Sequence, residues 1–380
     1  MRDGPENPED PPVKVSLPLA PAFIRSQEPR LAPLIDHYGK SGSLHPSILV
    51  TGLEGVGKRS LVAHLIHTLF CDETIFANAS GEADEDAPGL FGDTPPTAPA
   101  KTRRSPCGQC PSCIRASRGQ WLDLFWFEPE SSDEETRLGT HKIDAFRELK
   151  SKLGIGAAEE PFRIVVIADA DRMTGQAANS ILKVLEEPPK NWIFILTASD
   201  SSRLLPTILS RCMEIRLAPL SPETIFEILK DHKGHEFNSS RARVASRAAN
   251  GSLSRALVYL GEDAWELRNQ LIHLISNPAA GWIRLVDQLA KSQIQTHLGL
   301  DLLESILMDL LQSRIEGKAH VWTHEDQREL LEQIAGSRGL DAPVILRILE
   351  QIAGKRRLAS LTLNAKLLAQ EILIPVLEVL

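Results

Sequence analysis

The feature that most restricts the fold of this chain is a glycine-rich turn between a β-branched segment and a segment with helical periodicity. Residues 47–51 (SILVT) are mostly apolar, and residues 60–69 (SLVAHLIHTL) repeat Leu and Ile at helical spacing. The turn contributes the glycines and the lysine of a Gly-x4-Gly-Lys pattern: Gly52, Gly55, Gly57 and Lys58. In a strand–loop–helix unit of this kind, loop amides and the helix N-terminus attract phosphate. The pattern predicts an α/β domain built on a phosphate-binding loop.

The same loop departs from the usual pattern at the position that ligates magnesium. Arg59 stands where hydrolysing loops carry Ser or Thr, and Ser60 comes one residue late. One residue rotates a helical side chain by about 100°, so Ser60 is not expected to take over the metal. We therefore expect the fold of a phosphate site without Mg²⁺. ATP binding by this chain is doubtful, and no productive hydrolysis is expected.

The acidic element of the nucleotide site is also incomplete. Residues 163–168 (RIVVIA) are typical of a buried parallel strand. Counted back from the helix near Asn179, Ala168 takes the metal-holding position and Asp169 the second acidic position. With a shift of one residue, Asp169 holds the metal and Ala170 replaces the second acid. In either register, one of the two carboxylates of a hydrolysing site is missing.

The cysteines indicate a metal site rather than disulfides. Cys107, Cys110 and Cys113 form a C-x2-C-x2-C run, and the total of five is odd. Tetrahedral zinc needs a fourth ligand beside these three. Another cysteine, His141 or water could supply it, and a redox cluster is the alternative without metal.

Composition and charge indicate a multidomain globular protein. The 380 residues are 42% hydrophobic and 24% charged, with a formal net charge of −8, which disfavours a stand-alone binder of DNA phosphates. No segment approaches the roughly 18 apolar residues of a membrane span, and the N-terminus lacks the pattern of a secretory signal, so we expect a cytoplasmic protein without membrane contact.

Local composition predicts how the domains follow one another. Residues 1–20 are Pro-rich and predict a flexible tail, and residues 72–106 predict an acidic insertion. Strands alternate with helices over residues 45–217, which predicts a parallel sheet in an α/β domain at residues 21–218. Only helical patterns follow, and they predict a small helical domain at 219–261 and a larger one at 262–380.

Two longer motifs resemble a known family. Residues 177–189 (AANSILKVLEEPP) and 192–212 (WIFILTASDSSRLLPTILSRC), together with residues 23–29 (FIRSQEP) and 364–368 (NAKLL), resemble the delta-prime family of bacterial DNA polymerase III clamp-loader subunits. The resemblance extends from about residue 23 to the C-terminus and is strongest in the first 220 residues. It implies an AAA+ α/β module with an inserted zinc knuckle, a helical lid and an all-helical collar used in oligomerisation. The phosphate loop of this family is commonly degenerate, as here.

The resemblance also implies site residues. Ser210-Arg211-Cys212 matches a Ser-Arg-Cys motif whose arginine reaches the ATP of the neighbouring subunit, so Arg211 is expected to act in trans. The family places a further zinc-binding cysteine at the end of the helix after the phosphate loop, which is Cys71 here. The implied zinc ligands are Cys71, Cys107, Cys110 and Cys113.

Two sensor positions of the family are less clear in this sequence. Thr197 occupies the first-sensor position, although in a degenerate site it could be only a polar end of a strand. Ser254 occupies the position of the second-sensor arginine, and Arg255 lies next to it. A sensor role for Arg255 is therefore not expected.

The predicted function is that of a clamp-loader subunit without intrinsic ATPase. Its expected partners are the gamma/tau and delta subunits, and indirectly the sliding clamp and primer-template DNA. The main alternative is an active gamma/tau-type ATPase subunit, which the degenerate magnesium site disfavours. A zinc-dependent nucleic-acid module is a third possibility, which the acidic balance disfavours.

Overall fold

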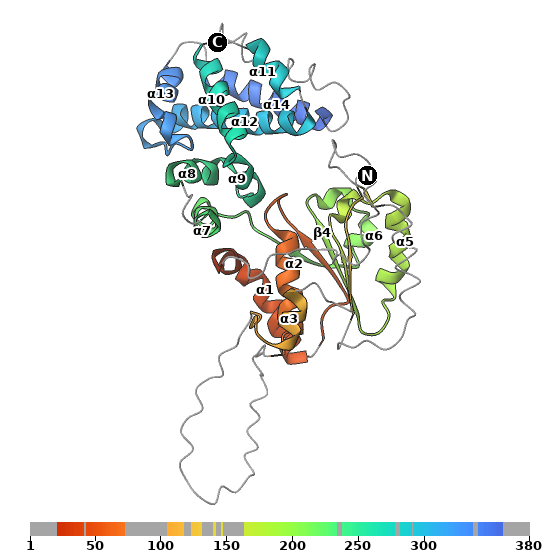
Figure 1. Ribbon diagram of the computed structural model, residues 1–380. Helices are drawn as coiled ribbons and strands as arrows, with labels where there is room; N and C mark the ends of the chain where they lie inside the picture. The colour runs from red at the N-terminus through yellow and green to blue at the C-terminus, as the bar shows by residue number, and fades with distance from the viewer. Residues whose placement is uncertain are drawn as a thin grey trace, which may run out of the picture. The chain divides into compact units, whose positions relative to one another are not determined.

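The chain folds into two compact units, which meet in sequence between Pro219 and Leu220 (Figure 1). The structure, a computed structural model, describes residues 21–41, 43–72, 105–117, 123–130, 140–141, 146, 163–233, 238–277, 282–290, 292–336 and 341–359. The expected tail, most of the acidic insertion and the motif at 364–368 lie outside the described residues.

A five-stranded parallel sheet forms the centre of the first unit. Its strands are β1 (Ser47–Thr51), β2 (Leu124–Phe127), β3 (Arg163–Ile167), β4 (Trp192–Ala198) and β5 (Met213–Arg216). Their order is β2-β3-β4-β1-β5, and each neighbouring pair is parallel. β1 and β4 are buried along their whole length, because helices cover both faces of such a sheet. The predicted parallel α/β sheet is confirmed.

Helices flank this sheet on both sides in Figure 1. The helices on one side are α1 (Pro21–Ser41), α2 (Lys58–Phe70) and α3 (Pro111–Ser117), and those on the other are α5 (Gly175–Glu186) and α6 (Pro206–Leu209). Ala177, Ile181 and Leu185 recur every four residues along α5, and they pack in one core with Ile208 of α6. This core holds α5 and α6 together.

The start of α2 depends on glycine. Gly57 has a φ of 100°, and a Cβ built there would lie 2.7 Å from the ring of Phe23. A larger residue would meet both the left-handed backbone penalty and this aromatic ring. The loop therefore keeps its turn because glycine alone fits between α1 and α2.

The second unit is helical in the residues that the structure describes. Its helices are α7 (Pro222–Lys233), α8 (Ser239–Ala248), α9 (Leu253–Tyr259), α10 (Glu262–Ser276), α11 (Trp282–Leu289), α12 (Gln293–Glu316), α13 (Arg328–Gly336) and α14 (Ala342–Ala359). Leu303, Ile306, Leu307 and Leu310 of α12 are almost fully buried, and α12 packs on α10 and α14. Among the described helices, none is long and apolar enough to span a bilayer.

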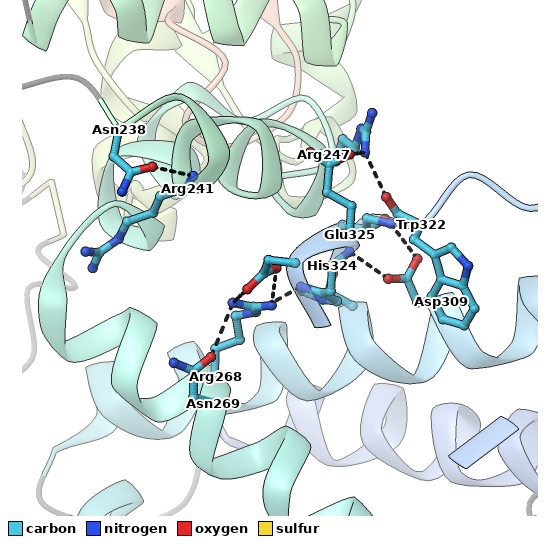
Figure 2. A network of polar contacts seen from close by, with 12 residues as sticks. Asn238, Arg241, Arg247, Arg268, Asn269, Asp309, Trp322, His324 and Glu325 are labelled. Atoms are coloured by element: carbon cyan, nitrogen blue, oxygen red, sulfur yellow. Dashed lines mark hydrogen bonds and ion pairs between the residues drawn. The ribbon is translucent and has the colours of Figure 1, made fainter. Parts of the chain in front are cut away.

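A buried polar network stabilises this helical unit (Figure 2). Arg268 of α10 is 2% exposed and donates from Nη1 and Nη2 to Asp326, at 3.0 and 2.6 Å. Its Nε donates to Nδ1 of His324 at 3.1 Å. Burial lowers the pKa of His324 to about 3, so the imidazole stays neutral and can accept from the guanidinium.

The same network connects the segments on either side of residue 261. Arg247 of α8 donates from Nη1 to the Trp322 carbonyl and pairs with Glu325, both at 2.8 Å (Figure 2). Asp309 of α12 accepts the backbone N–H of His324 at 2.9 Å. Residues 220–359 thus lie in one compact unit, and the expected division at 261 into a lid and a collar stays a prediction.

Candidate functional site

The lysine of the phosphate loop is bound to the loop itself. Lys58 Nζ donates to the carbonyls of Gly52 and Leu53, at 3.0 and 3.1 Å, and to Ser199 Oγ at 2.8 Å. An ammonium has three donors, and these contacts use all three. Lys58 is 5% exposed, and desolvation by burial lowers its pKa while Asp169 opposes the shift. A phosphate would have to displace these contacts to reach the lysine.

Arg59 pairs with acidic groups at the ends of two neighbouring strands. Its Nη2 lies 2.6 Å from Asp169 Oδ2, and its Nη1 lies 3.1 Å from Glu128 Oε1. Glu128 follows β2 and Asp169 follows the end of β3, and the carboxyl ends of adjacent parallel strands lie at one edge of a sheet. A positive charge of the chain itself therefore neutralises carboxylates that could otherwise attract a divalent cation.

The structure also decides which acid faces the phosphate loop. Ala168 is fully buried, whereas Asp169 has a left-handed φ of 50° and directs its carboxylate to Arg59. Its backbone N–H donates to Thr197 Oγ1 at 2.9 Å. Of the two acids that pair with Arg59, Asp169 makes the shorter contact, and Ala170 comes after it. Thr197, the expected first-sensor position, holds the backbone at this turn.

Sequence reasoning missed Glu128, although a signal for it existed. Glu128 comes directly after the apolar strand at 124–127, at the same edge of the sheet as Asp169. Acidic residues that follow adjacent parallel strands are expected to lie close together. Sequence periodicity could not show that Arg59 would reach both.

Cys71 comes close to the three cysteines of the C-x2-C-x2-C run. The four Sγ atoms all lie within 4.8 Å of one another, with 3.9 Å between Cys107 and Cys113 and 4.0 Å between Cys110 and Cys71. Tetrahedral zinc with Zn–S bonds of about 2.3 Å separates its sulfur atoms by about 3.8 Å. The four-cysteine group could therefore hold a metal such as zinc.

The surroundings of the four-cysteine group fit a thiolate site. Backbone N–H groups of Cys107, Gln109 and Cys110 donate to cysteine sulfurs at 3.2–3.3 Å. Such donors stabilise negative sulfur ligands. All four cysteines are free of disulfides. Burial raises the pKa of the Cys110 and Cys113 thiols, so a metal would have to displace their protons.

His141 lies apart from this group. Its Nε2 is 2.6 Å from the Ala168 carbonyl, and its ring packs against Phe146. Within the residues described, the group of possible metal ligands contains the four cysteines and not this histidine.

The Ser-Arg-Cys segment follows α6 and contacts α5. Arg211 Nη2 lies 2.5 Å from Glu186 Oε1, and its Nη1 donates to the Thr207 carbonyl at 2.8 Å and to Ser210 Oγ at 3.2 Å. The Arg211 side chain is 32% exposed. Cys212 packs against the core beside α5 and α6, and burial raises its pKa to about 11.

Arg255 is engaged inside the helical unit. Its Nε lies 3.5 Å from Asp301 Oδ2 of α12, and its backbone N–H is accepted by Ser252 Oγ, the N-cap of α9. These contacts give Arg255 a structural role in the second unit.

Comparisons with known proteins identify the family. A model described as "DNA polymerase III, delta subunit" matches residues 97–221, and one described as "DNA polymerase III, delta subunit, C terminal" matches 262–376. The DNA polymerase III subunit delta' of Bacillus subtilis is 26% identical over 340 residues, which covers 88% of this chain and 91% of the relative. The chain belongs to the delta' family of DNA polymerase III clamp-loader subunits. The delta' subunit of Escherichia coli is 28% identical over 298 residues, 78% of each chain.

Other DNA polymerase III subunits resemble parts of the chain. The DNA polymerase III subunit tau of Escherichia coli is 28% identical over 221 residues, 57% of this chain and 29% of the relative. Among solved structures, a gamma-subunit-related protein of Thermotoga maritima covers 70% of this chain and 88% of that chain at 20% identity, with a TM-score of 0.35. The chain has an α/β fold with a five-stranded parallel sheet, a four-cysteine group and a C-terminal helical domain, so the expected α/β fold class is confirmed.

Proposed function

We propose that the chain is a non-hydrolysing, or barely hydrolysing, subunit of the clamp loader that supplies Arg211 to the ATP of a neighbouring subunit. In this way it helps the complex to load the sliding clamp on primed DNA. The observation that carries the proposal is the ion pair of Arg59 with Asp169, because it places a guanidinium against the carboxylate that a magnesium site would use.

The contacts of Lys58 support the loss of hydrolysis. A productive site needs the lysine on the β/γ-phosphates and a bound Mg²⁺. Here the ammonium is bound to two loop carbonyls and Ser199, and Arg59 follows it where a metal-ligating hydroxyl is required. The lysine that would bind the phosphates and the side chain at the metal-ligand position are thus both engaged within the chain. Nucleotide binding would require both contacts to open.

A role in trans suits the position of Arg211. A guanidinium stays charged at any physiological pH and can bind phosphate oxygens as a two-pronged donor. Arg211 follows α6, one third of its side chain is exposed, and its acidic partner among the described residues, Glu186, is 46% exposed. This arrangement leaves the arginine accessible to a phosphate of another subunit.

The proposed partners follow from this role. The ATP that Arg211 serves would belong to a gamma/tau subunit, and the delta subunit would complete the complex that opens the clamp for primer-template DNA. Similarity to tau over 57% of the chain keeps an active gamma/tau-type ATPase as the alternative. The pairing of Arg59 disfavours that alternative, and a cytoplasmic location agrees with the proposed role.

Zinc is the proposed cofactor of the four-cysteine group. The sulfur spacing, the backbone N–H donors and the burial of three of the four cysteines agree with a closed structural site, which needs four protein ligands. Such a zinc would link the end of α2 to α3 and take no part in the chemistry of ATP.

The trans role is tested with Arg211→Ala in a reconstituted clamp loader. An arginine of this kind contributes about 10³-fold or more, so turnover at the ATP site that Arg211 serves should fall by about that factor. The chain alone should show no ATPase before or after the substitution. Arg203→Ala is the matched control, because Arg203 is an exposed arginine in the same segment. Undiminished turnover in the Arg211→Ala complex would remove the proposal.

A further inference from the structure

The guanidinium of Arg211 is held from two different helices. Thr207 and Ser210, which belong to the segment of Arg211 itself, bind Nη1, and Glu186 at the last position of α5 binds Nη2. Sequence motifs single out Arg211 but say nothing of a partner 25 residues away. The contact with Glu186 is therefore a feature that only the fold creates.

The carboxylate of Glu186 lies at the C-terminus of α5, where a negative charge is unfavourable for the helix. A helix C-terminus carries partial negative charge, so an acidic residue there weakens the helix unless a cation is nearby. Arg211 supplies that cation to Glu186. Mutual compensation of this kind favours one orientation of a long side chain that would otherwise sample many rotamers.

The pair leaves part of the guanidinium available. Arginine has five N–H donors, and the three contacts use two on Nη1 and one on Nη2. Within the part of the chain that the structure describes, the N–H of Nε and the second N–H of Nη2 make no hydrogen bond. Two donors are enough for a forked contact with phosphate oxygens. Glu186 can thus hold the arginine without removing it from use.

We propose that Glu186 is a positioning residue that orients Arg211 for the triphosphate of the neighbouring subunit. The inference rests on the trans role of Arg211 proposed above. Glu186 does not touch the nucleotide. It lowers the entropy that Arg211 loses when it meets the charge of the transition state, which is how pre-orientation accelerates a reaction.

The size of the effect follows from the exposure of the pair. The two side chains are 32% and 46% exposed, and exposed ion pairs are weak. Their usual free energy corresponds to a factor of about 1.4 to 5 in rate. Glu186→Ala in the reconstituted complex should therefore lower kcat by about 1.4- to fivefold. The ATP concentration at half-saturation should stay unchanged, because ATP is bound by the other subunit.

The experiment compares wild type with five variants in the same reconstituted clamp loader: Glu186→Ala, Glu186→Gln, Glu187→Ala, Arg211→Ala and the Glu186→Ala/Arg211→Ala double variant. Glu186→Gln keeps an oxygen acceptor without the charge and should lie between wild type and Glu186→Ala. Glu187→Ala removes the neighbouring exposed carboxylate, which makes no ion pair among the described residues, and it should behave as wild type. Combined with Arg211→Ala, the Glu186→Ala substitution should cause no further loss.

Two results would overturn the inference alone. If Glu186→Ala leaves kcat unchanged or raises it while Arg211→Ala lowers it, then Glu186 does not position the arginine. If Glu186→Ala lowers kcat equally with and without Arg211, then its role is structural. If Arg211→Ala itself has no effect, the proposed function fails, and the inference fails with it.

Discussion

Acidic or ionisable groups gather at both ends of α2, and the two ends differ in what neutralises their negative charge. At the first turn, Arg59 neutralises two carboxylates from other strands, Asp169 and Glu128. At the other end, Cys71 joins three thiols, and no member of that group is basic. At the first turn the cation is a side chain of the protein, Arg59. At the cysteine end, thiolates would need a bound metal cation to neutralise them.

The difference shows that a sequence motif does not reveal whether a side chain or a bound metal ion supplies its positive charge. Both ends lie in patterns that usually mark metal sites, a Gly-x4-Gly-Lys loop and a set of spaced cysteines. Exposure does not separate the arginines either, because Arg59 is 39% and Arg211 is 32% exposed. What differs is the set of partners. Within the described part of the chain, two carboxylates pair with Arg59, whereas Arg211 pairs with one exposed carboxylate, that of Glu186.

The largest expected effect concerns the cysteine end of α2. Purified protein should contain one zinc per chain, and Cys110→Ser should lose it. The stability lost should be on the order of 5 kcal/mol, below the roughly 10–16 kcal/mol of an isolated zinc finger, because the neighbouring helices also hold the cysteines. Metal analysis and thermal unfolding measure both quantities. Cys212→Ser is the control, since Cys212 lies outside the group. If carefully prepared protein contains no zinc, then the cysteine end of α2 does not bind a metal, and the proposed difference between the two ends is wrong.

The second effect concerns the middle of α2 and is a dependence on pH. Burial lowers the pKa of His64 and of His67 from 6.5 to about 4. Between pH 6.5 and 4 the unfolded chain binds protons that the folded chain does not. The free energy of unfolding should therefore fall as the pH falls, by up to about 1.4 kcal/mol per pH unit for each histidine. Above pH 6.5 this contribution to the pH dependence disappears.

Urea unfolding at several pH values measures this slope. His64→Gln should reduce this slope, because the variant has no buried imidazole at that position. An unchanged slope in His64→Gln would mean that burial of this histidine is not what makes α2 sensitive to acid.

The smallest effect concerns the phosphate-loop end. Arg59→Ala leaves Asp169 and Glu128 close together without a cation and should lower stability by about 1 kcal/mol, the value of a partly exposed pair. Millimolar Mg²⁺ should restore part of this loss in the variant and have no effect on wild type, because bound ligand stabilises only a form that has the site. Denaturant unfolding with and without Mg²⁺ measures this.

A matched control uses the other arginine beside the loop. Arg172→Ala breaks the pair with Glu54, whose side chain is 71% exposed, and should show no response to Mg²⁺. Equal stabilisation of wild type and Arg59→Ala by Mg²⁺ would mean that Arg59 does not take the place of a metal. The two ends of α2 would then be alike.

Elements made by local sequence were predictable. The strands at 47–51 and 163–167 are apolar runs bounded by turns, and such runs need no distant partner to be recognised. The glycine loop was predictable for the same reason, since positive φ values are a property of the residues themselves. The sequence could not predict whether Ala168 or Asp169 takes the metal-holding position after β3, because a shift of one residue leaves the local apolar pattern unchanged.

Contacts between distant residues were beyond the sequence. The approach of Arg59 to Glu128 spans 69 residues, and that of Cys110 to Cys71 spans 39. The resemblance to a family suggested Cys71 but gave no partner for Arg211. Such pairs depend on strand order and on how α5 and α6 pack, and these are decided by burial of apolar surface across the whole unit.

By itself, the amino-acid sequence determined the strand–loop–helix unit, the family of the chain and the absence of a hydroxyl after Lys58. These are properties of residue type and spacing along the chain. Only the tertiary structure decided that Arg59 faces two carboxylates, that four thiols meet at the end of α2 and that Glu186 holds Arg211. The reason is physical: interactions between charges depend on distance in space, and the parallel order of the strands sets those distances.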